Sequence, residues 1–284
     1  MTRSTKSSLK FSNVRRNNTK LKEEFLDIET QRQAKRIGRQ QKRLEKESGI
    51  ANVVNINTRQ RVVRYEDIKE LKPLTDTQYD FFEAWEDDQA TGYMLSGSAG
   101  TGKTAISIAK GIMAVLDPQT PYKKLVIVRS SVQVRDQGFL KGDLSEKMEA
   151  FEAPYIGVLQ ELTGRKDAYQ NLKDIGKIEF ISTSAIRGIT LNDAIVIADE
   201  VGAMNWHECK SILTRVGKNT KIIMIGDTAQ VDLIYKKTDT TGIYDLLEVT
   251  RKMGGFRNFK FTEDDIVRSE FVREFLITCN NMGL

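Results

Sequence analysis

The sequence predicts an α/β fold in which a mostly parallel sheet is covered by helices on both faces. Short runs rich in Val and Ile alternate with stretches of helical character through residues 65–284, and this alternation is typical of parallel strands joined by helices. The chain has 284 residues, of which 39% are hydrophobic and 29% are charged. These values indicate a globular body with a full core, and with tails attached.

The individual elements follow from local pattern. A helix is expected from Asp76 to Asp88, where Tyr79, Phe81, Phe82 and Trp85 supply an apolar surface. Strands are expected at 93–96, 124–129, 178–182, 194–199, 221–226 and 258–262. Helices fit between them at about 103–116, 144–163, 206–215 and 242–253.

The first 64 residues differ in composition from the rest. Residues 1–50 hold 14 Lys/Arg and 6 Asp/Glu, a net charge of +8, whereas the whole chain carries +5. We therefore expect a basic N-terminal arm over 1–64, disordered through residue 20 and helical at about 21–47, attached to a body at 65–284. Such an arm can bind RNA or single-stranded DNA through phosphate contacts. The alternatives are a solvated tail and a helix that docks on a neighbouring subunit.

Several classes of protein are disfavoured. The two cysteines are far apart and there is one histidine, which argues against a disulfide scaffold and the usual zinc sites. No apolar stretch is long enough to span a membrane, and the N-terminus has no apolar signal segment. We therefore expect a cytoplasmic protein without membrane contact, whose chemistry depends on carboxylates, hydroxyls, lysine, arginine and a hard cation such as Mg²⁺.

Residues Gly97 to Thr104 read G-S-A-G-T-G-K-T and fit the Walker A pattern. An apolar run precedes the motif and a helical stretch follows it, so the glycine-rich loop can wrap phosphates at a helix N-terminus. In this interpretation Lys103 reaches the β- and γ-phosphates and Thr104 ligates Mg²⁺. The alternative is a glycine-rich turn. The residues expected to bind the nucleotide are Gly97, Ser98, Ala99, Gly100, Thr101, Gly102, Lys103, Thr104 and Ala105.

An apolar run, residues 194–198, ends in Asp199 and Glu200. After a Walker A motif, this pattern predicts that Asp199 holds Mg²⁺ through its water shell and that Glu200 polarises the attacking water. The alternative is an ordinary buried strand whose acids mark its solvent end.

Two amide side chains are further candidates. Gln230 follows the strand expected at 221–226 and lies near Asp227, a position suited to sensing the γ-phosphate; the alternative for Asp227 is a turn or helix cap. Gln78 precedes the first core strand, and its amide can pair with the edge of adenine. The alternative for Gln78 is a solvated helix residue.

From about residue 70 to 276 the sequence resembles the PhoH family of P-loop ATPases. The matching pieces, in order, are Lys72-Pro73 with Gln78, the stretch 97–104, Gly138-Phe139-Leu140-Lys141-Gly142-Asp143-Leu144 with Lys147, Arg187-Gly188, Thr190-Leu191-Asn192-Asp193, Asp199-Glu200, Leu213-Thr214-Arg215, Gly226-Asp227 with Gln230 and Asp232, and Ile266-Val267-Arg268. The resemblance implies a single RecA-like domain like the first motor domain of superfamily 1 helicases. It also implies ATP hydrolysis often associated with RNA, and ring-like homo-oligomers, with a hexamer favoured. One departure is Val201-Gly202-Ala203, where the family has Ala-Gln-Asn.

An arginine is the remaining expected part of an ATPase site. Only about 54 residues follow Gln230, fewer than a second motor domain needs. Arg268 is the candidate finger, acting in trans from a neighbouring subunit; the alternative is a structural salt bridge. Two other functions stay open for the chain as a whole: a small-molecule P-loop kinase, and a regulatory module that binds ATP to stabilise an oligomer.

Overall fold

The structure is a computed structural model that describes residues 61–87, 89–130, 144–227 and 241–282. The chain divides into two units, Met1–Arg61 and Val62–Leu284. All the helices and strands described below belong to the second unit. The expected arm helix at 21–47 lies outside the described residues. None of the described helices is both long enough and apolar enough to cross a bilayer.

Six parallel strands form one sheet in the order β3-β2-β4-β5-β1-β6. The strands are β1 (Gly92–Gly97), β2 (Lys124–Arg129), β3 (Ile178–Ser182), β4 (Ala194–Ala198), β5 (Thr220–Gly226) and β6 (Phe256–Phe261). Every pairing is parallel, so all six carboxyl ends lie at the same edge of the sheet. The expected α/β class with a parallel sheet is therefore confirmed.

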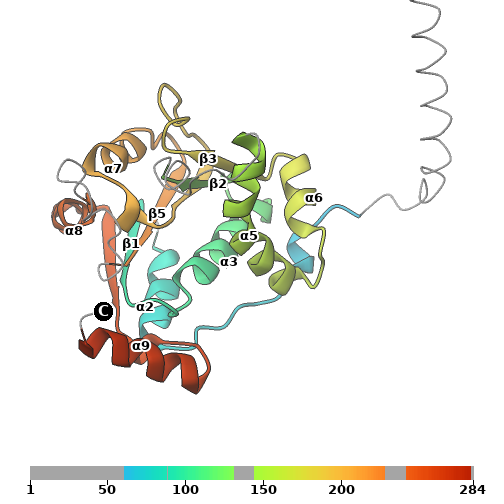
Figure 1. The fold of residues 1–284 in the computed structure, drawn as a ribbon. Coiled ribbons are helices and arrows are strands. Elements are labelled where there is room, and N and C mark those ends of the chain that lie inside the picture. The colour runs from blue at the N-terminus through green and yellow to red at the C-terminus, as the bar shows by residue number, and fades with distance from the viewer. Residues whose placement is uncertain (1–60, 88, 131–143, 228–240, 283–284) are drawn as a thin grey trace, which may run out of the picture. The chain divides into compact units, whose positions relative to one another are not determined.

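Helices cover both faces of this sheet, as predicted. Figure 1 shows α3 (Lys103–Leu116), α5 (Leu144–Thr163) and α6 (Ala168–Asp174) on one side and α7 (Trp206–Leu213) and α8 (Ile243–Lys252) on the other. The core is divided in the same way, because neighbouring side chains of a strand point to opposite faces. Tyr93 and Leu95 of β1 pack with α3 and α5, whereas Met94 packs with α7 and α8.

The element boundaries agree closely with the sequence pattern, and the differences have local causes. Helix α2 (Asp76–Trp85) begins at a Thr75 cap and ends before Asp88, because Glu86 already caps it. Strand β6 begins at Phe256, two residues earlier than expected.

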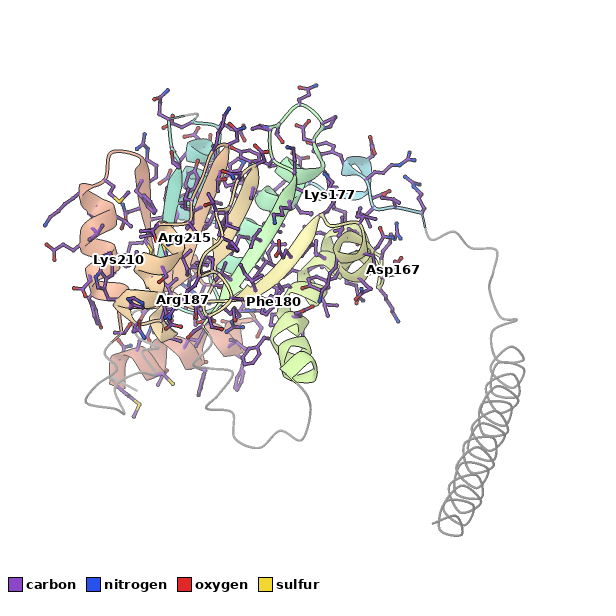
Figure 2. The ribbon with its side chains drawn as sticks, turned by 90° about the horizontal axis from the view of Figure 1, so that it is seen from above. Asp167, Lys177, Phe180, Arg187, Lys210 and Arg215 are labelled. Atoms are coloured by element: carbon purple, nitrogen blue, oxygen red, sulfur yellow. The ribbon has the colours of Figure 1, made fainter. Side chains whose placement is uncertain are left out.

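Two helices were not expected from the sequence, α6 and α9 (Glu270–Met282). Helix α6 is only seven residues long, and α9 buries none of its residues. At the far edge of the sheet, β3 carries Phe180, whose side chain is seen from above in Figure 2.

Candidate nucleotide-binding site

The glycine-rich loop connects β1 to α3 at the carboxyl edge of the sheet. Three of its glycines, Gly97, Gly100 and Gly102, have φ values of 119°, 76° and 79°. These values lie in the left-handed region that glycine adopts without steric cost. The loop can therefore turn tightly and present the N-terminus of α3, with its unpaired N–H groups, to a ligand.

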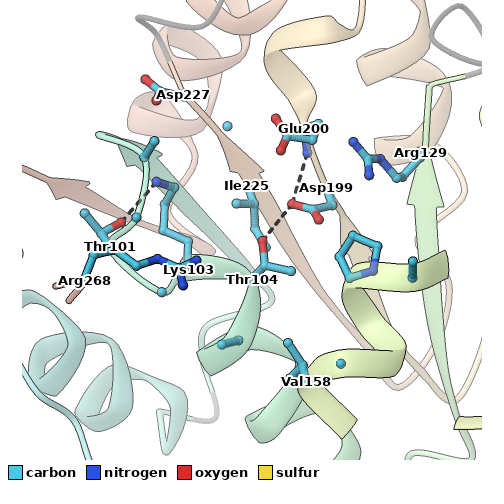
Figure 3. Close-up of a pocket in the computed structure, with 18 of the residues that line it drawn as sticks. Thr101, Lys103, Thr104, Arg129, Val158, Asp199, Glu200, Ile225, Asp227 and Arg268 are labelled. Carbon is cyan, nitrogen blue, oxygen red and sulfur yellow. Dashed lines mark hydrogen bonds between the residues drawn. The ribbon is translucent and has the colours of Figure 1, made fainter. Parts of the chain in front are cut away.

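A cavity of about 510 Å³ opens in front of this loop. Its walls come from the carboxyl ends of β2, β4 and β5, from the loop and the start of α3, from α5, and from one residue near the C-terminus (Figure 3). The lining residues used below are Ala99 to Ala105, Arg129, Pro154, Gly157, Asp199, Glu200, Asp227 and Arg268. A site at the carboxyl ends of parallel strands is the usual location for ligands in open α/β sheets.

Lys103 is folded back onto the loop in this conformation. Its ammonium donates hydrogen bonds to the carbonyls of Gly97 at 2.9 Å and Ser98 at 2.6 Å, and to Thr101 Oγ1 at 3.1 Å. Burial lowers the pKa of Lys103, while the carboxylates of Asp227, Glu200 and Asp199 act in the opposite direction. The amine thus lies among oxygen acceptors that phosphate oxygens can replace.

Ser98 and Gly97 support the loop and do not line the cavity. Besides accepting from Lys103, Ser98 donates its backbone N–H to the carbonyl of Phe261 on β6 at 3.2 Å. Of the ten residues expected to bind the nucleotide, Gln78 included, the seven from Ala99 to Ala105 line the cavity.

Thr104 and Asp199, the two expected magnesium ligands, are in direct contact. Thr104 Oγ1 donates to Asp199 Oδ1 at 3.2 Å, and the backbone N–H of Glu200 donates to the same oxygen at 3.1 Å. Hydroxyl and carboxylate oxygens are the hard ligands that Mg²⁺ prefers, so the donor set fits the ion. No group of three or more His, Cys, Asp or Glu that could hold a metal occurs within the described part of the chain. Mg²⁺ commonly completes its coordination with substrate phosphates and water.

Glu200 has an unusual backbone and a perturbed acidity. Its φ of 57° is left-handed, which is uncommon for a residue other than glycine and recurs at functional sites. Burial raises the pKa of its carboxyl, and the neighbouring Asp199 raises it further. A carboxylate with a raised pKa at the cavity wall is suited to accept a proton from water.

Arg268 lies in the cavity of its own chain. The preceding residue, Val267, donates its N–H to the carbonyl of Gly100 at 3.1 Å. The side chain of Arg268 also lies close to Gly100, because its Cγ is 3.1 Å from the position that a Cβ would occupy on that glycine. From the sequence we expect this arginine to act from a neighbouring subunit, whereas the fold brings it to its own P-loop because the chain turns back past the loop after β6.

Gln78 contacts the P-loop from behind. Only 2% of Gln78 is exposed. Its Nε2 donates to the carbonyl of Thr101 at 2.9 Å, and its Oε1 accepts from the N–H of Leu74 at 2.9 Å. Because both ends of the amide are bonded and Gln78 does not line the cavity, its role in reading adenine stays a prediction. Gln230 lies outside the described residues, and its neighbour Asp227 lines the cavity.

Sequence reasoning missed two side chains at this site, Arg129 and Tyr155. Arg129 ends β2 at the carboxyl edge of the sheet, and that position was a usable signal. Tyr155 lies within α5 and donates its hydroxyl to Asp199 Oδ2 at 2.9 Å. Nothing in the local pattern separates it from an ordinary core tyrosine.

The glycine-rich loop joins a parallel strand to a helix, as phosphate-binding loops do. Together with the acidic pair at the end of a nearby strand, it defines a P-loop NTPase domain. The family model described as "PhoH-like protein" matches residues 70–279, and the chain belongs to the PhoH family. Protein PhoH of Escherichia coli (strain K12) is 30% identical over 257 residues, which cover 88% of this chain and 71% of that protein. A PhoH-like protein of Bacillus subtilis (strain 168) is 33% identical over 181 residues, which cover 63% of this chain and 55% of that protein.

Solved structures with a similar fold share little sequence with this chain. The large terminase from a thermophilic bacteriophage matches with a TM-score of 0.43 and 17% identity, over 72% of this chain and 50% of that one. A Bacteroides Pif1 helicase in complex with ADP-AlF3 and ssDNA matches with a TM-score of 0.39 and 14% identity, over 75% and 47%. The chain thus spans about half the length of these proteins.

Proposed function

We propose that this chain binds ATP with Mg²⁺ and hydrolyses it to ADP and phosphate. The observation that carries the proposal is the convergence of Lys103, the Thr104–Asp199 pair and Glu200 on one cavity. A purely structural ATP site needs the lysine and the magnesium ligands, but it does not need a partly buried carboxylate with a raised pKa beside them. A small-molecule kinase would pass the phosphoryl group to an acceptor, so phosphate release without an added acceptor separates it from a hydrolase.

Each residue has a separate role in this proposal. Lys103 exchanges the carbonyls of Gly97 and Ser98 for phosphate oxygens. Glu200 orients the attacking water and takes its proton, and Arg268 stabilises charge on the γ-phosphate. Magnesium, when bound by Thr104 and Asp199 together with phosphate oxygens, neutralises phosphate charge.

Gln78 and Gln230 complete the proposal as the contact to adenine and the sensor of the γ-phosphate. For Gln78, which is only 2% exposed, this requires that the second N–H and the second lone pair of its amide become accessible when the nucleotide binds.

Two finer parts of the proposal concern partners. We propose that hydrolysis is coupled to RNA or single-stranded DNA, because the basic arm carries a net charge of +8 over residues 1–50 and cationic segments bind phosphate backbones. We also propose a ring-like homo-oligomer, with a hexamer favoured by the family resemblance.

The test is a phosphate-release assay with Mg²⁺ and ATP, with and without single-stranded RNA, on a size-exclusion fraction of known mass. Phosphate release without an added acceptor is expected, and it must be lost in Lys103→Ala. Tight ATP binding without any release would reject hydrolysis in favour of the regulatory module. A chain lacking residues 1–50 is expected to lose RNA affinity and its salt dependence; unchanged values for both would reject the arm as the RNA-binding segment.

A further inference from the structure

The carboxylate of Asp199 is held from two sides. Its Oδ1 accepts from Thr104 Oγ1 and from the N–H of Glu200, both of which belong to the expected P-loop and acidic-pair machinery. Its Oδ2 accepts from Tyr155, which belongs to neither motif. Asp199 is only 4% exposed, so water has little access to replace any of these donors. The plane of the carboxylate is therefore set by three hydrogen bonds. One of them comes from α5, which carries neither the P-loop nor the acidic pair.

Tyr155 is itself rigidly placed. The residue is fully buried, at 0% exposure, and its ring packs against Phe180 of β3 with ring centroids 5.8 Å apart. Its hydroxyl is the donor in the bond to Asp199, because a phenol carries a proton to give and a carboxylate oxygen accepts. A phenylalanine would fill the same apolar space, so packing alone does not account for the hydroxyl.

Helix α5 also forms one wall of the nucleotide cavity. Pro154 and Gly157, which flank Tyr155 in the sequence, line the cavity. From the same helix, Tyr155 donates its hydroxyl to Asp199, which also lines the cavity. The helix thus contacts both the volume that the nucleotide occupies and the carboxylate that serves the ion.

We propose that Tyr155 is a positioning residue for the magnesium site: it holds Asp199 Oδ2 so that Oδ1 stays directed at Thr104. The inference rests on the proposed function, because it assumes that Asp199 serves Mg²⁺. Outer-shell partners that orient metal ligands typically contribute 10- to 100-fold in metal affinity when they are removed. We therefore expect loss of the Tyr155 hydroxyl to raise the Mg²⁺ concentration needed at the site about tenfold.

The primary test is Tyr155→Phe in the full chain, with ADP binding measured as a function of Mg²⁺ concentration. ADP affinity in EDTA reports the P-loop alone, and its strengthening on Mg²⁺ titration reports the ion site. The expected result is a half-saturating Mg²⁺ concentration about tenfold higher than in the parent chain, with ADP affinity in EDTA unchanged. A Tyr155→Phe titration that superimposes on that of the parent overturns the proposal.

The matched control is Tyr169→Phe on α6. Tyr169 is also buried, at 3% exposure, and burial raises the pKa of its phenol, but no described hydrogen bond joins it to Asp199. Its removal is expected to leave both measurements unchanged. If Tyr169→Phe shifts the Mg²⁺ titration as far as Tyr155→Phe does, the effect is general loosening of the fold and the proposal is wrong.

A second measurement separates positioning from stability. In an Asp199→Asn background the hydroxyl has no carboxylate to orient, so adding Tyr155→Phe should cause no further shift in the Mg²⁺ titration. An undiminished additional shift would overturn the proposal. If ADP binding by the parent is insensitive to Mg²⁺, there is no ion to position and the proposal for Tyr155 fails, whereas the proposed function stands or falls with phosphate release. If ADP binding depends on Mg²⁺ but ATP is not hydrolysed, only the proposed function fails.

Discussion

Arg268 gives the sharpest prediction about how the site is completed. The residue follows Val267, whose N–H is bonded to the carbonyl of Gly100, and it lines its own chain's cavity. An arginine that stabilises the transferring phosphoryl group contributes about 10³-fold or more in rate, which corresponds to about 4 kcal/mol of transition-state stabilisation. We expect Arg268→Ala to lower phosphate release by that factor. Arg273→Ala is the control. Arg273 forms a surface ion pair with Asp264 at 3.6 Å, and the loss of such an exposed pair should cost little.

The assay that locates the arginine mixes two inactive variants, Arg268→Ala and Lys103→Ala. If Arg268 acts within its own chain, every subunit of the mixture lacks one essential group, and the mixture is no more active than its separate components. If the arginine serves the neighbouring subunit, random mixing in a ring pairs an intact P-loop with an intact arginine at about a quarter of the sites. Recovery of about a quarter of the parent activity would therefore refute action within one chain. Full activity of Arg268→Ala alone would refute any catalytic role.

Two further predictions concern stability. Gly97→Ala should lower the unfolding free energy by at least about 3 kcal/mol, because φ is 119° and a Cβ would lie 1.9 Å from the carbonyl oxygen of Phe261. The control is Gly157→Ala, whose Cβ would meet no atom within 4 Å and which should be neutral or slightly stabilising. Equal melting temperatures of the two variants in thermal denaturation would contradict this prediction. Burial opposes ionisation of Asp265, but hydrogen bonds from the Thr262 N–H and from nearby threonine hydroxyls outweigh it and lower the pKa. The stability that Asp265 contributes is therefore present above the usual pKa of about 3.8 and is lost as the pH falls through the lower folded-state value. Asp265→Asn should flatten that acid limb in urea titrations at several pH values, and an unchanged limb would assign the pH dependence to other groups.

The fold was largely predictable because it is encoded in local runs. The strand at 124–129 and the helix at 103–116 have the expected bounds, since continuous Val/Ile runs and uninterrupted helical stretches leave few alternatives. Helix α9 was missed for a physical reason: its large apolar side chains Phe271 and Phe275 are 78% and 60% exposed. The apolar residues of the helix that are half-buried are Leu276, Ile277 and Cys279. This domain therefore covers the apolar stripe of α9 only in part.

The site likewise has a part that local sequence predicts and a part that it does not. The P-loop and the pair Asp199–Glu200 are contiguous motifs, and the strand order brings them to one cavity. Two other residues take part only through tertiary packing. Tyr155 reaches Asp199 from helix α5, beyond β2 in the chain, and Arg268 reaches the cavity from the segment after β6. The length that remains after Gln230 does not say where the last segment folds back. That Arg268 acts in trans stays a prediction, which the mixing assay tests.

The central claim is that Glu200 makes this cavity hydrolytic. The direct measurement is the identity of the nucleotide recovered from the protein after incubation with Mg²⁺ and ATP, compared between the parent chain and Glu200→Gln. We predict ADP and free phosphate from the parent. From Glu200→Gln we predict intact bound ATP, with turnover lower by at least about 10²-fold. Equal turnover by the two proteins would contradict the account.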